Sequence, residues 1–131
     1  MKKTSIIFSA FVCIISFTFF SVSCVSNKKE VLFGCDSVNV KFASNIKSIL
    51  ANNCDRCHST ANGATFGSGI IMDNYNEILV FVDTSMGGDG GVILRNVQHA
   101  AGANPMPKGG KISDCEIAQI AKWIKDGAPN N

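Results

Sequence analysis

One five-residue motif, Cys54-Asp55-Arg56-Cys57-His58, constrains the fold of this chain more than any other part of its sequence. The chain has 131 residues and six cysteines, and in this motif two cysteines stand three positions apart with a histidine directly after them. On a helical turn, side chains three positions apart lie on the same face. The motif therefore suits three kinds of chemistry: a redox dithiol, half of a zinc site, or the covalent attachment of a c-type haem.

The surroundings of the motif favour haem attachment. A redox Cys-x-x-Cys pair belongs to a strand–helix–strand context, and the sequence has no such pattern. A zinc site needs a second pair of ligands, and the residues left to supply it are only Cys35, Cys115 and His99. In the haem interpretation, the thiols of Cys54 and Cys57 bond to the two vinyl groups of one haem c, and His58 is the proximal iron ligand.

The N-terminal quarter of the chain has the pattern of an export signal. Met1-Lys2-Lys3 is a short positive start, and an uncharged apolar run follows from Ile6 to Val25. The small residues before Cys24 resemble the cleavage box of bacterial lipoproteins, in which the new N-terminal cysteine is lipidated. The run is also long enough for an uncleaved transmembrane anchor, and this alternative stays open. Both interpretations tether an exported domain to the periplasmic side of a bacterial membrane.

Cleavage before Cys24 divides the chain into a signal peptide of residues 1–23, a tether of residues 24–38 and a domain of residues 39–131. Cleavage removes two of the twelve basic residues, so that ten basic residues face ten acidic residues in the mature protein. A nucleic-acid-binding domain would carry a basic excess, and we therefore expect no nucleic-acid partner.

Hydrophobic periodicity predicts several helices in the domain. Apolar residues at positions 42, 46, 49 and 50 share one face of a helix that runs toward Cys54. A second, short helix is expected after the cap residue Asp73, and it extends to Val82. The glycine-rich stretch 87–91 breaks this helix, and residues 92–99 form another short helix.

The last helix has the clearest boundaries. Ser113 and Glu116 form a capping box at its start, and Gly127 ends it. Its apolar stripe is formed by residues 117, 120, 121 and 124, and Trp123 lies beside this stripe as an expected core residue. Because no stretch alternates apolar and polar residues as a strand does, the expected fold class is all-α.

Met106 is the candidate for the distal iron ligand because it stands between Pro105 and Pro107. Proline on each side restricts the loop, and a rigid loop holds a weak thioether ligand at low entropic cost. Ligation by histidine and methionine raises the reduction potential of a haem. The alternatives are a simple turn with a buried methionine, and ligation by His99, which would give a bis-histidine haem.

Cys35 and Cys115 remain after the other cysteines are assigned, and in an oxidising compartment they are expected to form a disulfide. By chain entropy, a disulfide that closes so long a loop stabilises the fold by up to about 4.5 kcal/mol. Two buried free thiols are the alternative.

Together these features resemble a class I monohaem cytochrome c domain, especially the exported c-type cytochromes common in Bacteroidetes. The stretches that carry the resemblance are Ile46–Leu50, Asn53–Ser59, Pro105–Gly110, Ser113–Ile117 and Trp123–Pro129. The resemblance implies a cytochrome c-like fold in which N- and C-terminal helices pack around one covalent haem, with Met106 as the distal ligand.

A haem with protein ligands on both faces has no open position for a substrate, so the expected function is electron transfer and not enzymatic catalysis. The expected partners are redox proteins, a donor and an acceptor, and Lys108 and Lys111 beside the ligand loop are candidates for steering them. The alternative is a haem enzyme or ligand sensor, peroxidase-like or gas-binding, with an open or labile distal site. A third hypothesis is an accessory subunit of a larger membrane respiratory complex.

Overall fold

The computed structural model of the protein describes residues 34–83 and 90–131. The predicted signal peptide, Cys24 and Met86 lie outside these residues, and so does most of the tether. In the described residues the structure consists of helices and loops without a strand, in agreement with the expected all-α class. No helix among them is long and apolar enough to span a lipid bilayer.

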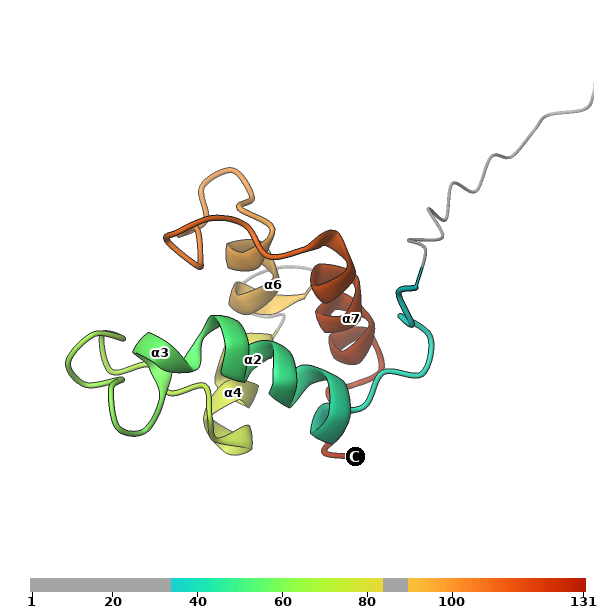
Figure 1. Cartoon of the computed structure of the whole chain (residues 1–131), viewed down its shortest axis with the longest axis horizontal. Helices are drawn as coiled ribbons and strands as arrows, with labels where there is room; N and C mark the ends of the chain where they lie inside the picture. Colours follow the sequence, from blue (N-terminus) through green and yellow to red (C-terminus); the bar gives the residue numbers. More distant parts are fainter. Residues whose placement is uncertain (1–33, 84–89) are drawn as a thin grey trace, which may run out of the picture. The chain divides into compact units, whose positions relative to one another are not determined.

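Three helical segments follow one another into the cysteine–histidine motif (Figure 1): η1 (Phe42–Ile46), α2 (Lys47–Asn53) and α3 (Asp55–His58). The residues at positions 42, 46, 49 and 50 are all buried, as the periodicity predicts. Cys54 departs from helical geometry, with φ −120° and ψ −40°. The helix is therefore interrupted at the first cysteine of the motif, and α3 forms a separate turn that carries Cys57 and His58.

Helix α4 (Tyr75–Val82) is capped by Asn74, and the predicted cap Asp73 is wrong. The Asn74 side chain accepts a hydrogen bond of 3.0 Å from the Asn76 N–H. Asp73 instead accepts two hydrogen bonds of 2.7 Å from the backbone N–H and the hydroxyl of Thr60. These bonds lower the pKa of Asp73 and tie the loop after the motif to the start of α4.

Helix α6 (Gly91–Val97) passes close to α4. A Cβ at Gly91 would lie 2.6 Å from the carbonyl oxygen of Phe81, so only glycine allows this approach. The helix ends at Val97, before the predicted end at His99. His99 follows the helix with a positive φ of 54°, which is uncommon for a residue other than glycine.

Helix α7 (Asp114–Lys125) starts with the predicted capping box, in which the Ser113 and Glu116 side chains each bind the other residue's backbone N–H. Its buried face, however, is rotated from the predicted stripe. Trp123 has an exposure of 0 % and shares the buried face with Ile117 and Ile120, while residues 121 and 124 are only partly buried. The indole N–H donates a hydrogen bond of 2.9 Å to the carbonyl oxygen of Pro129, which satisfies the polar atom of this core residue.

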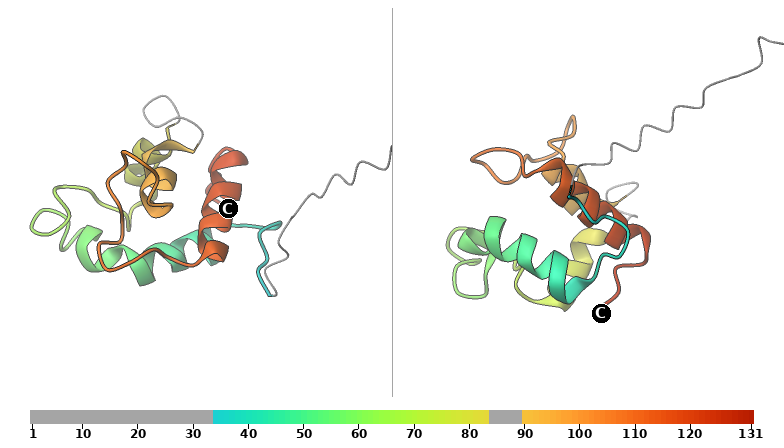
Figure 2. Two further views of the ribbon diagram at one scale, coloured as in Figure 1. Left: turned by 90° about the horizontal axis from the view of Figure 1, so that it is seen from above. Right: turned by 45° about the vertical axis from the view of Figure 1, so that its right-hand side comes forward.

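Phe42 connects the first and last helical segments. Its ring lies 5.6 Å from the Trp123 ring of α7 and 4.9 Å, edge to face, from the Tyr75 ring of α4, measured between centroids. Asn131 at the C-terminus accepts hydrogen bonds of 2.9 Å from the N–H groups of both Phe42 and Ala43. The C-terminal end of the chain therefore lies beside η1, as the two views of Figure 2 show.

A disulfide joins Cys35 to Cys115 in the first turn of α7, and the two Cα atoms are 5.7 Å apart. These are the two cysteines that the sequence leaves without another role. Beside the bond, the Gln119 side chain donates a hydrogen bond of 2.8 Å to the backbone oxygen of Asp36. The end of the predicted tether is therefore fixed to α7.

Candidate functional site

The two cysteines of the motif carry free thiols in different surroundings. Cys54 is partly buried against the hydrophobic core, and this burial, with the nearby carboxylates of Asp55 and Glu116, raises the pKa of its thiol to about 11. Cys57 is exposed. Neither thiol is engaged in a disulfide, and the Cys57 thiol is the more accessible of the two.

The His58 side chain is oriented by the loop that follows it. Its Nδ1 lies 3.3 Å from the carbonyl oxygen of Ile70, and the His58 backbone oxygen accepts a hydrogen bond of 2.6 Å from the Met72 N–H. When Nδ1–H donates to that carbonyl, the proton is fixed on Nδ1 and Nε2 keeps its lone pair. Metal-binding histidines are commonly oriented in this way by a backbone carbonyl. If His58 binds an iron, as the sequence predicts, Nε2 is the nitrogen that this contact leaves for it.

Glycine allows this loop to close on the motif. A Cβ at Gly67 would lie 2.6 Å from the backbone oxygen of Cys57 and 2.7 Å from Nδ1 of His58, and a Cβ at Gly63 would lie 2.8 Å from the Ile70 oxygen. Any larger residue at Gly67 would displace the His58 ring or the motif backbone. The sequence predicts only a loop here, although the three glycines within residues 61–69 were a signal that the backbone approaches closely.

The predicted distal ligand, Met106, lies in a loop that is bound to the end of α6. Its backbone N–H donates a hydrogen bond of 3.1 Å to the oxygen of Asn96, and Nε2 of His99 lies 3.2 Å from its backbone oxygen. Met106 is half-buried. Of the other methionines considered, Met72 packs against the core as expected.

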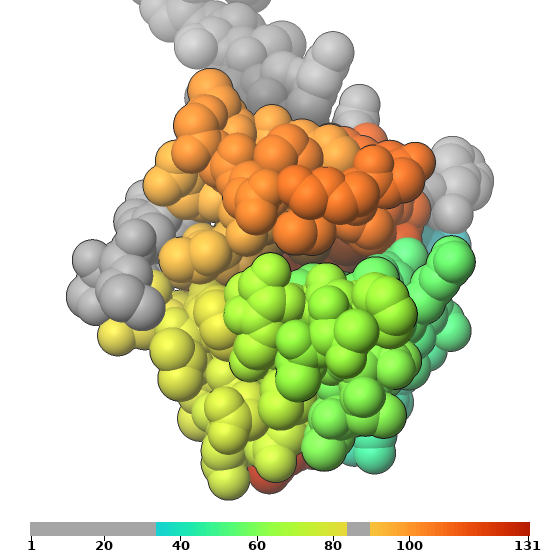
Figure 3. Space-filling view, turned by 90° about the vertical axis from the view of Figure 1, so that its left-hand side faces the viewer, coloured from blue at the N-terminus to red at the C-terminus, as the bar shows by residue number. Residues whose placement is uncertain are grey.

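Figure 3 shows a cleft between two walls of the described domain. The wall drawn in orange belongs to the region around residues 100–110, and the wall drawn in green belongs to the region around residues 55–70. The loop of Met106 and the motif with its following loop therefore lie on opposite sides of one cleft.

The donor groups on the two walls fit a c-type haem. Two free thiols are one turn apart, a histidine beside them has its Nδ1 3.3 Å from a backbone oxygen, and the loop of residues 100–110, which carries Met106, forms the facing wall in Figure 3. No group of three or more His, Cys, Asp or Glu side chains in the described residues is arranged to hold a metal ion by itself. Haem brings four nitrogen ligands of its own, so the protein need supply only the two axial ligands.

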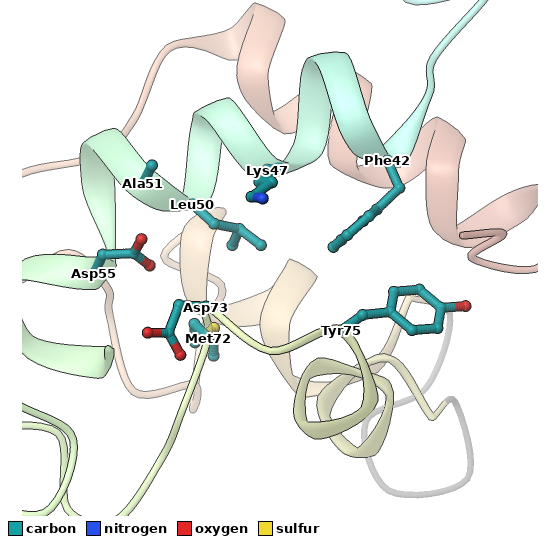
Figure 4. A pocket seen from close by; sticks show the side chains of 8 residues that line it. All are labelled: Phe42, Lys47, Leu50, Ala51, Asp55, Met72, Asp73 and Tyr75. Atoms are coloured by element: carbon teal, nitrogen blue, oxygen red, sulfur yellow. The ribbon is translucent and has the colours of Figure 1, made fainter. Parts of the chain in front are cut away.

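A separate pocket of about 220 Å³ lies between α2 and the start of α4 (Figure 4). Neither the motif cysteines nor a histidine lines it; its lining residues are Phe42, Lys47, Leu50, Ala51, Asp55, Met72, Asp73 and Tyr75. Atom Oδ1 of Asp55 is buried without a hydrogen-bond partner among the described residues. Burial, followed by the charge of Asp73, raises the pKa of Asp55, while Lys47 opposes this shift.

The two lysines proposed to steer partners are not equivalent. Nζ of Lys111 forms a salt bridge of 3.1 Å with Asp114, which offsets its charge locally. Nζ of Lys108 donates a hydrogen bond of 2.6 Å to the neutral side chain of Asn104 and forms no salt bridge with another described residue. A steering role stays a prediction and is better supported for Lys108.

The structure thus keeps Cys54, Cys57 and His58 together at the turn of α3, and the region around residues 100–110, which contains Met106, forms the opposite wall of the cleft in Figure 3. His99 is hydrogen-bonded to that loop. The predicted lipidation site Cys24 lies outside the described residues. No protein-family model, curated protein or solved structure matches this chain.

Proposed function

We propose that this protein is an exported electron carrier that holds one covalently attached haem c and is tethered to a bacterial membrane. The observation that carries the proposal is the turn at residues 54–58. Two free thiols lie there beside a histidine whose Nδ1 is 3.3 Å from the Ile70 oxygen. This combination suits haem attachment and has no comparable use in a redox dithiol, which needs no oriented histidine.

In this proposal Cys54 and Cys57 hold the cofactor through thioether bonds, and His58 and Met106 are its axial ligands. Each thioether forms when one S–H bond adds across a vinyl C=C bond, with sulfur on one carbon and hydrogen on the other, so that no oxidant is consumed. When bound, the haem supplies one-electron exchange between Fe(III) and Fe(II).

The protein residues determine how that exchange proceeds. Ile70 and Gly67 keep the His58 ring in a fixed orientation, so the proximal ligand does not have to reorganise. Met106 would supply the second protein ligand of the haem and would so keep water and small ligands away. A soft thioether favours the reduced iron, which raises the reduction potential.

Haem staining of the full chain on a denaturing gel tests the proposal, after expression in a bacterium that matures c-type cytochromes. The unmodified protein should stain, because thioether bonds survive denaturation. The double variant Cys54→Ala/Cys57→Ala should lose the stain. The matched control is Cys35→Ala/Cys115→Ala, which also removes two cysteines and should still stain. An unstained wild-type chain, or a stained motif variant, would rule out covalent attachment at this motif.

A further inference from the structure

The end of α6 holds the methionine loop by three hydrogen bonds. The backbone oxygen of Asn96 accepts from the Met106 N–H at 3.1 Å, and its side-chain Oδ1 accepts from the Asn104 N–H at 3.2 Å. Nε2 of His99 lies 3.2 Å from the Met106 backbone oxygen. Both backbone polar groups of Met106 are therefore bound by two residues, Asn96 and His99, which we name the distal clip.

The two residues of the distal clip lie at the C-terminal end of α6, which is a well-packed helix. Ile93, Leu94 and Val97 of α6 are all buried in the core. Gly91 brings the start of the same helix against the backbone of α4. The Met106 loop therefore has little freedom to move, because its displacement would break the hydrogen bonds to Asn96 and His99.

His99 occupies a backbone position that normally favours glycine. Its N–H donates to the Asn96 oxygen at 3.2 Å, and the N–H of Ala100 donates to the Arg95 oxygen at 3.0 Å. Together with the positive φ of His99, this is the Schellman arrangement that ends many helices, with glycine usual at this position. The backbone alone would therefore favour glycine.

The side chain of His99 accounts for its presence at this position. Within the described residues its ring makes one hydrogen bond, the one to Met106. Because Nε2 of His99 binds the backbone oxygen of Met106, the ring positions the loop. The alternative is that His99 itself binds the iron.

We propose that Asn96 and His99 are positioning residues that hold the Met106 thioether at the distal iron position. This inference rests on the proposed function and adds the residues that keep its weak distal ligand bound. Without the clip, the loop would open more often, and small ligands would reach the iron during those openings.

The main test is His99→Gly in the haem-loaded full chain. Glycine suits the backbone at this position, so the helix end should be retained while the hydrogen bond to Met106 is lost. Loss of one hydrogen bond should raise the population of the open loop, and with it the rate of carbon monoxide binding to the reduced protein, about tenfold. The near-infrared sulfur-to-iron band of the oxidised protein should weaken in parallel.

Two variants control this experiment. His99→Gln restores a side-chain N–H donor and should recover most of the band. Ala128→Gly relieves a similar backbone conformation, φ 50°, at a residue outside both the clip and the loop that orients His58, and should leave band and binding rate unchanged. Asn96→Ala, which removes the acceptor for the Asn104 N–H, should act in the same direction as His99→Gly.

The outcomes separate the clip from the proposed function. One outcome would overturn the clip and leave the electron-carrier proposal intact. In it, His99→Gly keeps the sulfur-to-iron band and the carbon monoxide binding rate of the unmodified protein, while Met106→Ala loses the band. If Met106→Ala keeps the spectrum of the unmodified protein while His99→Gly loses the sixth ligand, His99 is the ligand and both the clip and Met106 ligation are wrong.

Discussion

If Met106 is the distal ligand, as we propose, it is the residue through which the chain acts most directly on the reduction potential. The thioether favours Fe(II), so Met106→Ala should lower the reduction potential of the haem. The expected decrease is on the order of one tenth of the ≈ 0.8 V range that different axial ligands cover. The variant should also lose the sulfur-to-iron band and bind carbon monoxide when reduced. Redox titration and absorption spectra measure these changes.

Met106→His is the companion variant, because it keeps the sixth position filled while it replaces the thioether. It should give a bis-histidine haem with a lower potential and no carbon monoxide binding. The fold should survive in both variants because Cys54 and Cys57 still hold the haem. If the potential and the sulfur band are the same in Met106→Ala as in the unmodified protein, then Met72, Met86 or His99 must be examined as the ligand.

At this same scale, the sequence shows which residues stand together in the motif but does not show their non-local contacts. The roles proposed for Cys54, Cys57 and His58 rest on their spacing within one helical turn, and they stay predictions. The partner of His58, the Ile70 oxygen, is twelve residues away and depends on the path of a glycine-rich loop. Asp73 and Asn74 are both good cap residues, and only the contact with Thr60 decides between them.

Among the elements, α7 is linked to the haem motif through Glu116. Its Oε1 accepts a hydrogen bond of 2.9 Å from the Asn53 side chain, and Asn53 directly precedes Cys54. Burial by itself would raise the pKa of Glu116, but the hydrogen bonds from Ser113 and Asn53 outweigh burial and lower it below the ordinary value of 4.5. The charged form of Glu116 therefore stabilises the folded state.

Two substitutions at Glu116 separate hydrogen bonding from charge. At pH 7, Glu116→Ala should lower the free energy of unfolding by about 1 kcal/mol, because it removes the capping box. Glu116→Gln should retain more of the stability, since glutamine also serves in a capping box. Denaturant unfolding of the haem-loaded protein at several pH values measures both effects.

The direction of the pH dependence follows from the lowered pKa of Glu116. The stabilisation is present above pH 4.5, the ordinary value, and is lost as the pH falls through the lower folded value. In Glu116→Gln, the decrease in the free energy of unfolding that comes from protonation of Glu116 at low pH should be missing. An unchanged acid profile in Glu116→Gln would show that another group determines it.

The helices were also predictable to different degrees. The capping box and Gly127 define α7 from local residues, and its start is confirmed. The rotation of its buried face toward Trp123 was not predictable, because it depends on where Phe42 of the distant first segment lies. The interruption at Cys54 likewise has no marker in the apolar periodicity, which continues through the residue.

For the whole molecule, the predicted tether would determine how the domain meets its surroundings. The Cys35–Cys115 disulfide and the bond from Gln119 to Asp36 fix the chain to α7 directly before the domain begins. If Cys24 is lipidated, at most ten residues, 25–34, separate the lipid-bearing residue from this fixed point. The domain would then be held close to the membrane surface.

Mass spectrometry of the membrane fraction tests this arrangement. We expect the mature N-terminus to be Cys24 with two or three acyl chains. Cys24→Ser should leave the chain unprocessed or release it from the membrane. Recovery of peptides from residues 1–23 on the mature protein would indicate an uncleaved anchor.

Redox titration of the purified full chain, followed by addition of carbon monoxide to the reduced protein, tests the central claim most directly. We predict one covalently bound haem c per chain, a single reversible one-electron step, and a reduced spectrum that carbon monoxide does not change. Rapid carbon monoxide binding by the unmodified protein would contradict an electron carrier with both axial positions filled and favour a gas-binding or peroxidase-like haem protein.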